Sequence, residues 1–397
     1  MKKLCRSITK LPGSGIRKMF NMAQGMDDLI NFSLGEPGYT AAQHITDAAK
    51  LAIDKGKTQY TVNAGLLPLR EALSVKMEEK KGVCYQADTQ IMVASGGVEA
   101  LYLAMKVILE PEDEVVMGAP YFPNHLGQIM MCGAVPKIVP LLEEDGFCYN
   151  TKHLRAAITD KTKMIIINSP SNPTGSVTGE KVLREIAELC VEKDLYLITD
   201  EVYQEFIYAD TKYFSIASCP KMKERTIVVD SFSKTYAMTG WRCGFALGPQ
   251  HIISEMVKIQ ENIVSCVNTP TQYAAIAALN GKQDTLEAMI SQYDENRKLV
   301  QTEMESIPGL SMINPQGAFY AFIKIKETGL TSEKFAIQLL KKGKVVVVPG
   351  TAFGEAGEGY IRISYVSDKN DTIEGLRRIR RFMEDNQFRD PNEASPK

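Results

Sequence analysis

One segment of the sequence, residues 231–242, combines side chains that could hold a small molecule both covalently and electrostatically. Lys234 directly follows Ser233, with Ser231 three residues before it and Arg242 eight residues after it. A lysine amine can form a Schiff base with an aldehyde, whereas an arginine fork and serine hydroxyls suit a phosphate. Pyridoxal phosphate (PLP) carries both groups, and proteins hold it through a lysine. On its own the segment is a weak signal, because most lysines are solvated surface residues.

Further candidate residues follow short apolar runs that predict strands. Most of these runs are continuous rather than alternating, which is typical of strands covered on both faces of a parallel sheet. They lie at 91–94, 114–117, 164–167, 195–199 and 227–229. In such a sheet, ligands bind beyond the carboxyl ends of the strands. The residues found there are, in chain order, Gly96, Gly97 and Val98, then Tyr121, Asn172, Asp200 and Tyr203, and finally the Lys234 segment.

Asp200 and the two glycines each suit one part of PLP. A carboxylate at the end of a buried strand needs a cation or hydrogen-bond donors, and a protonated pyridine nitrogen would supply the cation. The alternative is that Asp200 only caps the helical stretch after it. Gly96 and Gly97 would let the N-terminus of a helix approach a phosphate. A tight strand-to-helix turn explains the same glycines.

Tyr121, Asn172 and Arg362 also allow two interpretations. The Tyr121 ring could lie on a planar pyridine ring or pack in the core. Asn172 could donate to a ring oxygen, or simply belong to the proline-rich turn at 168–175. Arg362 could bind the α-carboxylate of an amino acid, or be an exposed charge on an edge strand. The complementary groups at five consecutive strand ends favour the PLP interpretation.

The pattern between the strands predicts an α/β domain around a mainly parallel sheet. Helical stretches at 98–109 and 179–193 separate several strands, and the run at 244–247 could be an antiparallel member. After residue 280 the pattern changes to a smaller α+β unit that begins with a long helix at 285–307. Its expected strands are 318–325, 345–348 and 360–365, and its expected helices are 332–342 and 372–386. Residues 1–45 are expected to be rich in loops, and 390–397 to be a frayed tail.

Composition excludes several classes of protein. The chain has 397 residues, of which 44% are hydrophobic, and a formal net charge of -2. This charge gives no support for a nucleic-acid partner, and no apolar run approaches the ~20 residues of a membrane span. The eight cysteines lack paired spacing, so we expect reduced thiols in a cytoplasmic protein. The four histidines do not pair at metal-ligand spacing, so we expect no metal site, and for His125 a packing or solvent role.

Together these motifs resemble the class I, fold type I PLP-dependent aminotransferases, over nearly the whole chain. The resemblance is to bacterial and archaeal enzymes that act on aspartate or on aromatic amino acids. The matching segments occur in the family's order: Gly35-Glu36-Pro37, Tyr60 within Gln59-Tyr60-Thr61, Asn172-Pro173-Thr174-Gly175, Asp200-Glu201-Val202-Tyr203, Ser231 to Arg242, and Ile361-Arg362-Ile363-Ser364.

The resemblance implies transfer of an amino group from an L-amino acid to 2-oxoglutarate, in two half-reactions through pyridoxamine phosphate. A fold type I lyase that eliminates a β-substituent is an alternative with a similar site. A PLP-binding regulator without turnover is a third, but no basic recognition helix is seen in the sequence.

The resemblance also implies a role for each matching residue. Lys234 is the Schiff-base lysine and then moves the proton, while Asp200 pairs with the pyridine nitrogen. Tyr203 and Asn172 bond the 3-oxygen, and Tyr121 stacks on the ring. The phosphate is held by Gly96, Gly97, Val98, Ser231, Ser233 and Arg242. The substrate is bound by Arg362, which takes its α-carboxylate, and by Gly35, Tyr121 and Asn172.

The architecture implied by the resemblance has two domains and two subunits. A large PLP-binding domain with a seven-stranded sheet spans 46–281. A small domain combines 1–45 with 282–397 and closes over the substrate as a lid. In this family Tyr60 reaches the phosphate of the neighbouring subunit, which implies a homodimer with shared active sites.

Two positions depart from the pattern of relatives. Val98 stands where some bacterial aspartate aminotransferases carry a lysine for the side-chain carboxylate of the substrate. A strict preference for aspartate is therefore not expected. Cys243 stands where relatives commonly carry an aliphatic residue, and this change is small.

Overall fold

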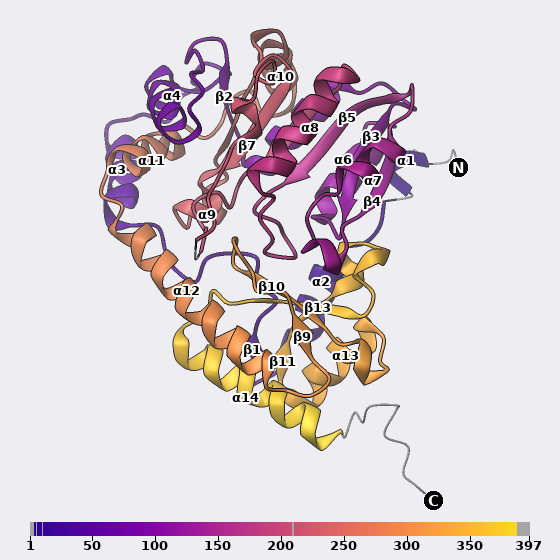
Figure 1. The fold of residues 1–397 in the computed structure, drawn as a ribbon. Coiled ribbons are helices and arrows are strands. Elements are labelled where there is room, and N and C mark those ends of the chain that lie inside the picture. Colours follow the sequence, from indigo (N-terminus) through magenta and orange to yellow (C-terminus); the bar gives the residue numbers. More distant parts are fainter. Residues whose placement is uncertain (1–3, 5, 10, 209, 387–397) are drawn as a thin grey trace, which may run out of the picture.

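A seven-stranded sheet forms the centre of the larger part of the molecule (Figure 1). The computed structural model describes residues 4, 6–9, 11–208 and 210–386. The strand order is β2-β8-β7-β6-β5-β3-β4, and only β8 runs antiparallel to its neighbours. The mainly parallel sheet and its antiparallel member are thereby confirmed. The strands are β2 (Ile91–Ala94), β3 (Glu114–Ala119), β4 (Val135–Pro140), β5 (Thr162–Asn168), β6 (Tyr196–Asp200), β7 (Thr226–Ser231) and β8 (Gly244–Leu247).

Helices cover both faces of this sheet, which explains why its strands are apolar at consecutive positions. Neighbouring residues of β5 point to opposite faces: Met164 and Ile166 pack in one core cluster, Ile165 and Ile167 in another. The first cluster includes α5 (Gly97–Ile108), α6 (Pro123–Met131) and α10 (Gln250–Ile263). The second includes α7 (Thr151–Ala157) and α8 (Glu180–Glu192). A third cluster packs α3 (Gln43–Asp54), α4 (Leu67–Lys81) and α11 (Thr269–Asn280) against β2 and β8.

The long helix α12 (Asp284–Glu305) leads into a second part with smaller sheets (Figure 1). An antiparallel sheet has the order β12-β13-β10-β9, and β1 pairs in parallel with β11. Because β1 belongs to the N-terminal segment, that segment lies against the C-terminal part. The predicted domain boundaries stay predictions. The elements are β1 (Ile30–Asn31), β9 (Ser311–Met312), β10 (Tyr320–Lys324), α13 (Ser332–Gln338), β11 (Val345–Val346), β12 (Val348–Pro349), β13 (Tyr360–Ser364) and α14 (Lys369–Asp385).

The N-terminal segment departs from the expected loops, because it contains α1 (Arg6–Thr9) and α2 (Gly15–Ala23). Ser14 caps α2, its Oγ accepting from the Arg17 backbone N–H at 3.2 Å. Ser14, within the segment expected to be rich in loops, therefore begins a helix. The predicted tail at 390–397 lies outside the described residues. Within the described part of the chain, no helix is long and apolar enough to cross a membrane.

Candidate active site

A cavity of about 190 Å³ lies at the carboxyl ends of β5, β6 and β7. Residues 35, 320 and 362 also line it, so the cavity lies between the seven-stranded sheet and the smaller sheets. Most of the predicted site residues come together there. They are Gly35, Gly97, Val98, Asn172, Asp200, Tyr203, Ser231, Ser233, Lys234, Arg242 and Arg362.

Lys234 reaches the cavity from α9 (Phe232–Thr235), a single helical turn directly after β7. Ser231 caps this turn, its Oγ accepting from the Ser233 backbone N–H at 3.1 Å. The Lys234 Nζ donates to the Gly35 carbonyl oxygen at 2.5 Å. Burial lowers the pKa of Lys234 to about 8. Near physiological pH its amine is therefore neutral far more often than the amine of a solvated lysine.

Two serine hydroxyls lie beside Lys234. Ser231 Oγ is 2.8 Å from Ser233 Oγ and 3.0 Å from the Cys243 carbonyl oxygen. Cys243 thus contributes through its backbone, and burial raises the pKa of its thiol to about 12. The thiol is protonated at neutral pH, which agrees with a packing role for this side chain.

Arg242 and the start of α5 complete a set of groups suited to an anion. The guanidinium donates to the carbonyl oxygens of Thr239 at 3.0 Å and Ser95 at 3.2 Å, and no carboxylate pairs with it among the described residues. Gly96 has a φ of 94°, a backbone conformation that other residues rarely adopt, and a Cβ built there would overlap the guanidinium unless Arg242 shifted. No side chain caps α5, and an uncapped helix N-terminus favours an anion.

Asp200 is 3% exposed at the end of β6, with its Oδ2 3.0 Å from His125 Nε2. His125 lies in α6 and is itself buried. The expected solvent role for His125 is wrong, because the side chain is buried and packs edge-to-face against Phe122. The ring has a role beyond packing, because it is hydrogen-bonded to Asp200, the one carboxylate among the described residues that line the cavity. A cation that enters the cavity would complete the pairing of Asp200.

Tyr203 faces the cavity together with a residue that the sequence did not indicate. Its hydroxyl lies 2.9 Å from the hydroxyl of Tyr320, which is in β10 and 117 residues further along the chain. Burial raises the pKa of Tyr203 well above its ordinary value, so the hydroxyl stays neutral and can donate a hydrogen bond. No motif marks Tyr320 in the sequence.

Arg362 is 1% exposed, so the alternative of an exposed edge charge is wrong. Its guanidinium carbon lies 4.4 Å from the ring centre of Tyr320 and 5.0 Å from that of Phe353. Its two terminal nitrogens donate to Asn172 Oδ1 at 3.0 Å and to the Ser33 carbonyl oxygen at 2.7 Å. The buried Nε has no partner among the described residues. A guanidinium in this state can bind an incoming carboxylate.

Three predicted residues do not line this cavity: Gly96, Tyr121 and Tyr60. Tyr121 lines a second cavity of about 670 Å³, which shares Ile16 and Val98 with the first. Tyr60 is 86% exposed. The predicted roles of these residues stay predictions. In the part of the chain that the structure describes, no group of three His, Cys, Asp or Glu side chains could hold a metal ion.

Comparison with known proteins agrees with this geometry. Residues 27–379 match the family Aminotransferase class I and II. The chain belongs to this family. The aminotransferase is 45% identical over 372 residues to an aspartate aminotransferase of Pyrococcus abyssi, covering 93% of this chain and 95% of the relative. It is 41% identical to aromatic-amino-acid aminotransferase 2 of Thermococcus litoralis, covering 94% and 96%.

Solved structures give the same result. The crystal structure of an aromatic aminotransferase from Pyrococcus horikoshii matches this aminotransferase with a TM-score of 0.90 at 43% identity, covering 94% of this chain and 100% of that one. The predicted family, the fold type I architecture and amino-group transfer are thereby confirmed. The lyase alternative is not favoured, because the relatives are named aminotransferases. The family implies PLP as the cofactor.

Proposed function

We propose that this aminotransferase binds PLP in the cavity of about 190 Å³ and moves the amino group of an aromatic or apolar L-amino acid to 2-oxoglutarate. The observation that carries the proposal is that an aspartate, an arginine and a lysine converge on one cavity, and none of them forms an ion pair with a lysine, an arginine or a carboxylate among the described residues. Asp200 suits the pyridine nitrogen, Arg242 the phosphate and Lys234 the aldehyde. When bound, PLP acts as an electron sink that stabilises negative charge at the α-carbon of the substrate.

Lys234 both anchors the cofactor and moves the proton in this proposal. Its Nζ takes the proton from the α-carbon of the donor amino acid and returns a proton to complete the transfer. A general base works best when its pKa lies near the working pH. The pKa of about 8 that burial gives Lys234 supports this role.

The other residues orient the cofactor and hold its charges. The negative charge of Asp200 would keep the pyridine nitrogen protonated, and His125 fixes the orientation of that carboxylate. Asn172 Oδ1 accepts from Arg362, and the side-chain N–H groups of Asn172 have no acceptor among the described residues. That amide and the hydroxyl of Tyr203 would donate to the 3-oxygen, and the Tyr121 ring would stack on the pyridine ring. The phosphate would be held by Gly96, Gly97, Val98, Ser231, Ser233 and Arg242.

Arg362 would bind the α-carboxylate of both substrates, with Gly35 close to the reacting amine. The donor side chain would lie towards Ile16, Val98, Leu101 and Phe122, which are apolar and line the cavity. An apolar lining of this kind suits an aromatic ring and offers no cation to a side-chain carboxylate. We therefore expect aromatic donors to be used in preference to aspartate.

We further propose a cytoplasmic homodimer with shared active sites. Support comes from Tyr60, whose side chain is 86% exposed although its segment matches a motif of this family. In a dimer, Tyr60 of one protomer would reach the phosphate-binding segment of its partner. The cysteines among the described residues are free thiols, which agrees with a reducing compartment. Sedimentation analysis of the purified protein tests the dimer.

The test of the proposed function is a panel of donors with PLP and 2-oxoglutarate: tyrosine, phenylalanine, aspartate, alanine and kynurenine. We expect glutamate to form, with kcat/KM for tyrosine about tenfold or more above that for aspartate. A higher kcat/KM for aspartate than for tyrosine would overturn only the proposed apolar environment of the donor side chain. No glutamate from any donor would overturn the proposed function.

A further inference from the structure

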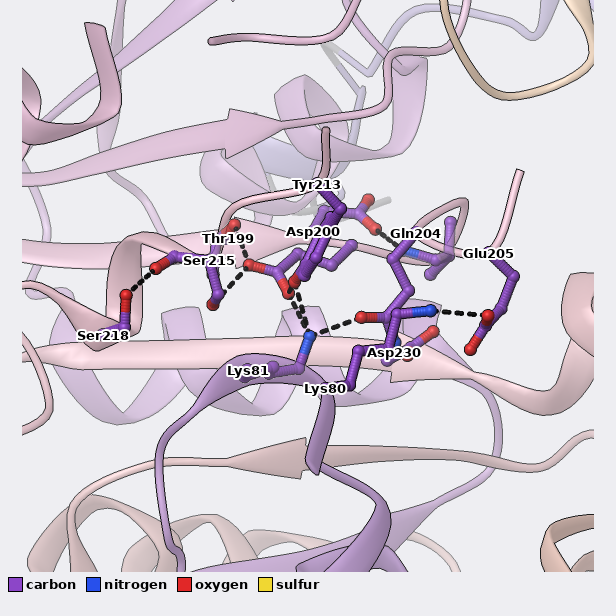
Figure 2. A network of polar contacts seen from close by, with 12 residues as sticks. Lys80, Lys81, Thr199, Asp200, Gln204, Glu205, Tyr213, Ser215, Ser218 and Asp230 are labelled. Carbon is purple, nitrogen blue, oxygen red and sulfur yellow. Dashed lines mark hydrogen bonds and ion pairs between the residues drawn. The ribbon is translucent and has the colours of Figure 1, made fainter. Parts of the chain in front are cut away.

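A buried polar network lies against β6 and β7, in contact with the end of α4 (Figure 2). We call it the Lys81 network, and it comprises Lys81, Glu201, Gln204, Tyr213 and Asp230. The Lys81 ammonium is fully buried and donates to the Glu201 carboxylate, to Gln204 Oε1 at 2.6 Å and to the Tyr213 hydroxyl at 2.7 Å. Figure 2 shows these contacts meeting at Lys81. An ammonium has three N–H groups, so this one is fully satisfied.

The network continues from Lys81 to both strand ends. The second carboxylate oxygen of Glu201 accepts from Thr199 Oγ1 at 2.9 Å. Gln204 turns its amide nitrogen to Asp230 and donates to Oδ2 of that carboxylate. The other oxygen, Oδ1, accepts from the Ser231 backbone N–H at 2.6 Å. A single glutamine therefore bridges the buried lysine and the aspartate that holds Ser231.

The position of the network in the sequence connects it to the active site. Glu201 directly follows Asp200, and Asp230 directly precedes Ser231. Successive side chains of an extended strand point to opposite faces of a sheet. Asp200 points into the cavity with His125, while Glu201 points into the network on the other side. Each of two proposed cofactor-binding residues is thus next in the chain to a residue that the network fixes.

The composition of the network indicates a role other than stability. A buried ion pair is commonly no more stabilising than apolar side chains of the same size, because both charges lose their hydration. A network in which every member has a partner does fix the geometry of its surroundings. Two strand ends that must present groups to one small molecule need such a constraint.

We propose that Lys81 and Gln204 are positioning residues, which fix the ends of β6 and β7 so that Asp200 and Ser231 meet the cofactor together. This inference rests on the proposed function, since it requires that PLP binds at those residues. Lys81 lies in α4 on the far side of the sheet from the proposed cofactor face. Its effect on the cofactor passes through the backbone of residues 200–201 and 230–231.

The experiment compares two buried cations of α4 by their effect on PLP affinity. Lys81→Met removes the centre of the network. Arg70→Met is the matched control, because Arg70 is also buried but donates to the carbonyl oxygens of Gly65, Ala87 and Asp88 and to no residue of the network. PLP is titrated into the cofactor-free protein, and binding is followed by the fluorescence of Trp241, the single tryptophan, which precedes Arg242. Thermal unfolding of the cofactor-free variants is measured alongside.

We expect both substitutions to lower the melting temperature, but only Lys81→Met to change the affinity. Its dissociation constant for PLP should rise by about tenfold or more, as for outer-shell residues of other bound groups. For Arg70→Met it should stay within about twofold, since that residue shares no partner with the site. Equal dissociation constants for the two variants would reduce Lys81 to a structural residue and overturn the inference.

If Lys81→Met does not fold, the variant Gln204→Leu provides a second test of the inference. This variant removes only the bridge between Lys81 and Asp230. We expect weaker PLP binding, so that the activity of the reconstituted enzyme reaches half of its maximum at a higher PLP concentration. Unchanged PLP binding in a folded Gln204→Leu protein would overturn the inference. Failure of the unmodified protein to bind PLP would instead overturn the proposed function, so the two failures are distinguishable.

Discussion

Arg242 and Arg362 both line the cavity, and the protein holds them in different ways. Arg242 is exposed and donates to backbone carbonyl oxygens next to the strand ends of the large sheet. Arg362 is buried between two aromatic rings, and its partners Asn172 and Ser33 lie 190 and 329 residues away in the sequence. The side proposed for the cofactor is thus built from local segments, each following a strand. The side proposed for the substrate is built from contacts between the two parts of the molecule.

This difference indicates that the two sides of the cavity depend on different kinds of contact. Local segments can hold a permanently bound phosphate whether or not the cavity is closed. Contacts that cross from Arg362 to Asn172 and Ser33 depend on how the two parts meet, so the substrate side would respond to closure of the small sheets over the cavity. Substitutions on the two sides should therefore affect different measurements.

The largest effect is expected at Lys234, which belongs to both sides because it donates to the Gly35 carbonyl oxygen and would meet the proposed cofactor. Lys234→Ala should lower kcat by roughly 10⁴-fold or more, since it removes both the anchoring amine and the general base. The visible absorption of the PLP-loaded protein should be lost, while melting of the cofactor-free protein should not fall. Lys258→Ala, at an exposed lysine of α10, is the control. Near-normal turnover of Lys234→Ala would refute the assigned role.

Asp200→Asn probes the cofactor side with almost no change of shape. Loss of the buried charge should lower kcat by about 10²- to 10³-fold, because the pyridine nitrogen loses its counter-ion. The KM for the amino donor should change much less. Steady-state kinetics over a range of donor concentrations measures both values. A kcat within about twofold of the unmodified enzyme would mean that Asp200 does not face the pyridine nitrogen.

A pair of conservative substitutions separates the two sides directly. Arg362→Lys should lower kcat/KM for donor and acceptor by about 10²-fold, the loss expected for hydrogen bonds between charged groups, with PLP affinity unchanged. Arg242→Lys should weaken PLP binding about tenfold and leave the KM values nearly unchanged. If the two variants showed the same pattern, the distinction between the sides would be lost.

The lowered pKa of Lys234 predicts how PLP capture depends on pH. Only the neutral amine attacks an aldehyde, and burial brings its pKa from 10.5 to about 8. The rate at which the visible absorption develops should rise about tenfold per pH unit below pH 8, roughly 30-fold from pH 6.5 to 9, and then level off. Stopped-flow mixing of PLP with cofactor-free protein measures this rate. A rise that continues to pH 10 would show an amine with an ordinary pKa.

The smallest effect is expected from Val98→Lys, which adds a cation where the donor side chain would lie. The ratio of kcat/KM for aspartate to that for tyrosine should rise by about tenfold, the value of one added charge contact. Val98→Met is the control for size. An unchanged ratio would place the donor side chain elsewhere in the cavity.

The parts of the site that follow strands could be predicted from the sequence, whereas contacts between distant segments could not. Asp200 stands directly after a continuous apolar run, and Lys234 stands five residues after another. Their place at the edge of a parallel sheet therefore follows from the pattern alone. His125 meets Asp200 across 75 residues, and Lys81 meets Glu201 across 120. Such pairs are determined by how the helices pack on the sheet, and this packing cannot be read from the spacing of residues in the sequence.

Prediction of the fold from the sequence also fails for some elements, namely an edge strand and an N-terminal helix. The buried central strands were predicted within about two residues, because their apolar runs are continuous. The edge strand β4 has three exposed residues among its six and carries prolines at positions 136 and 140, so it lacks that pattern. Helix α2 was missed because Ser14 lies between two glycines, which indicate a turn more strongly than a helix cap.

The most direct test of the central claim is a single half-reaction. PLP-loaded protein is mixed with tyrosine in the absence of any acceptor, and the 2-oxo acid formed is quantified per active site. The account predicts one equivalent of the 2-oxo acid of tyrosine, a matching loss of visible absorption, and recovery of that absorption when 2-oxoglutarate is added. Continuous release of ammonia without a stoichiometric 2-oxo acid, or no product at all, would contradict it.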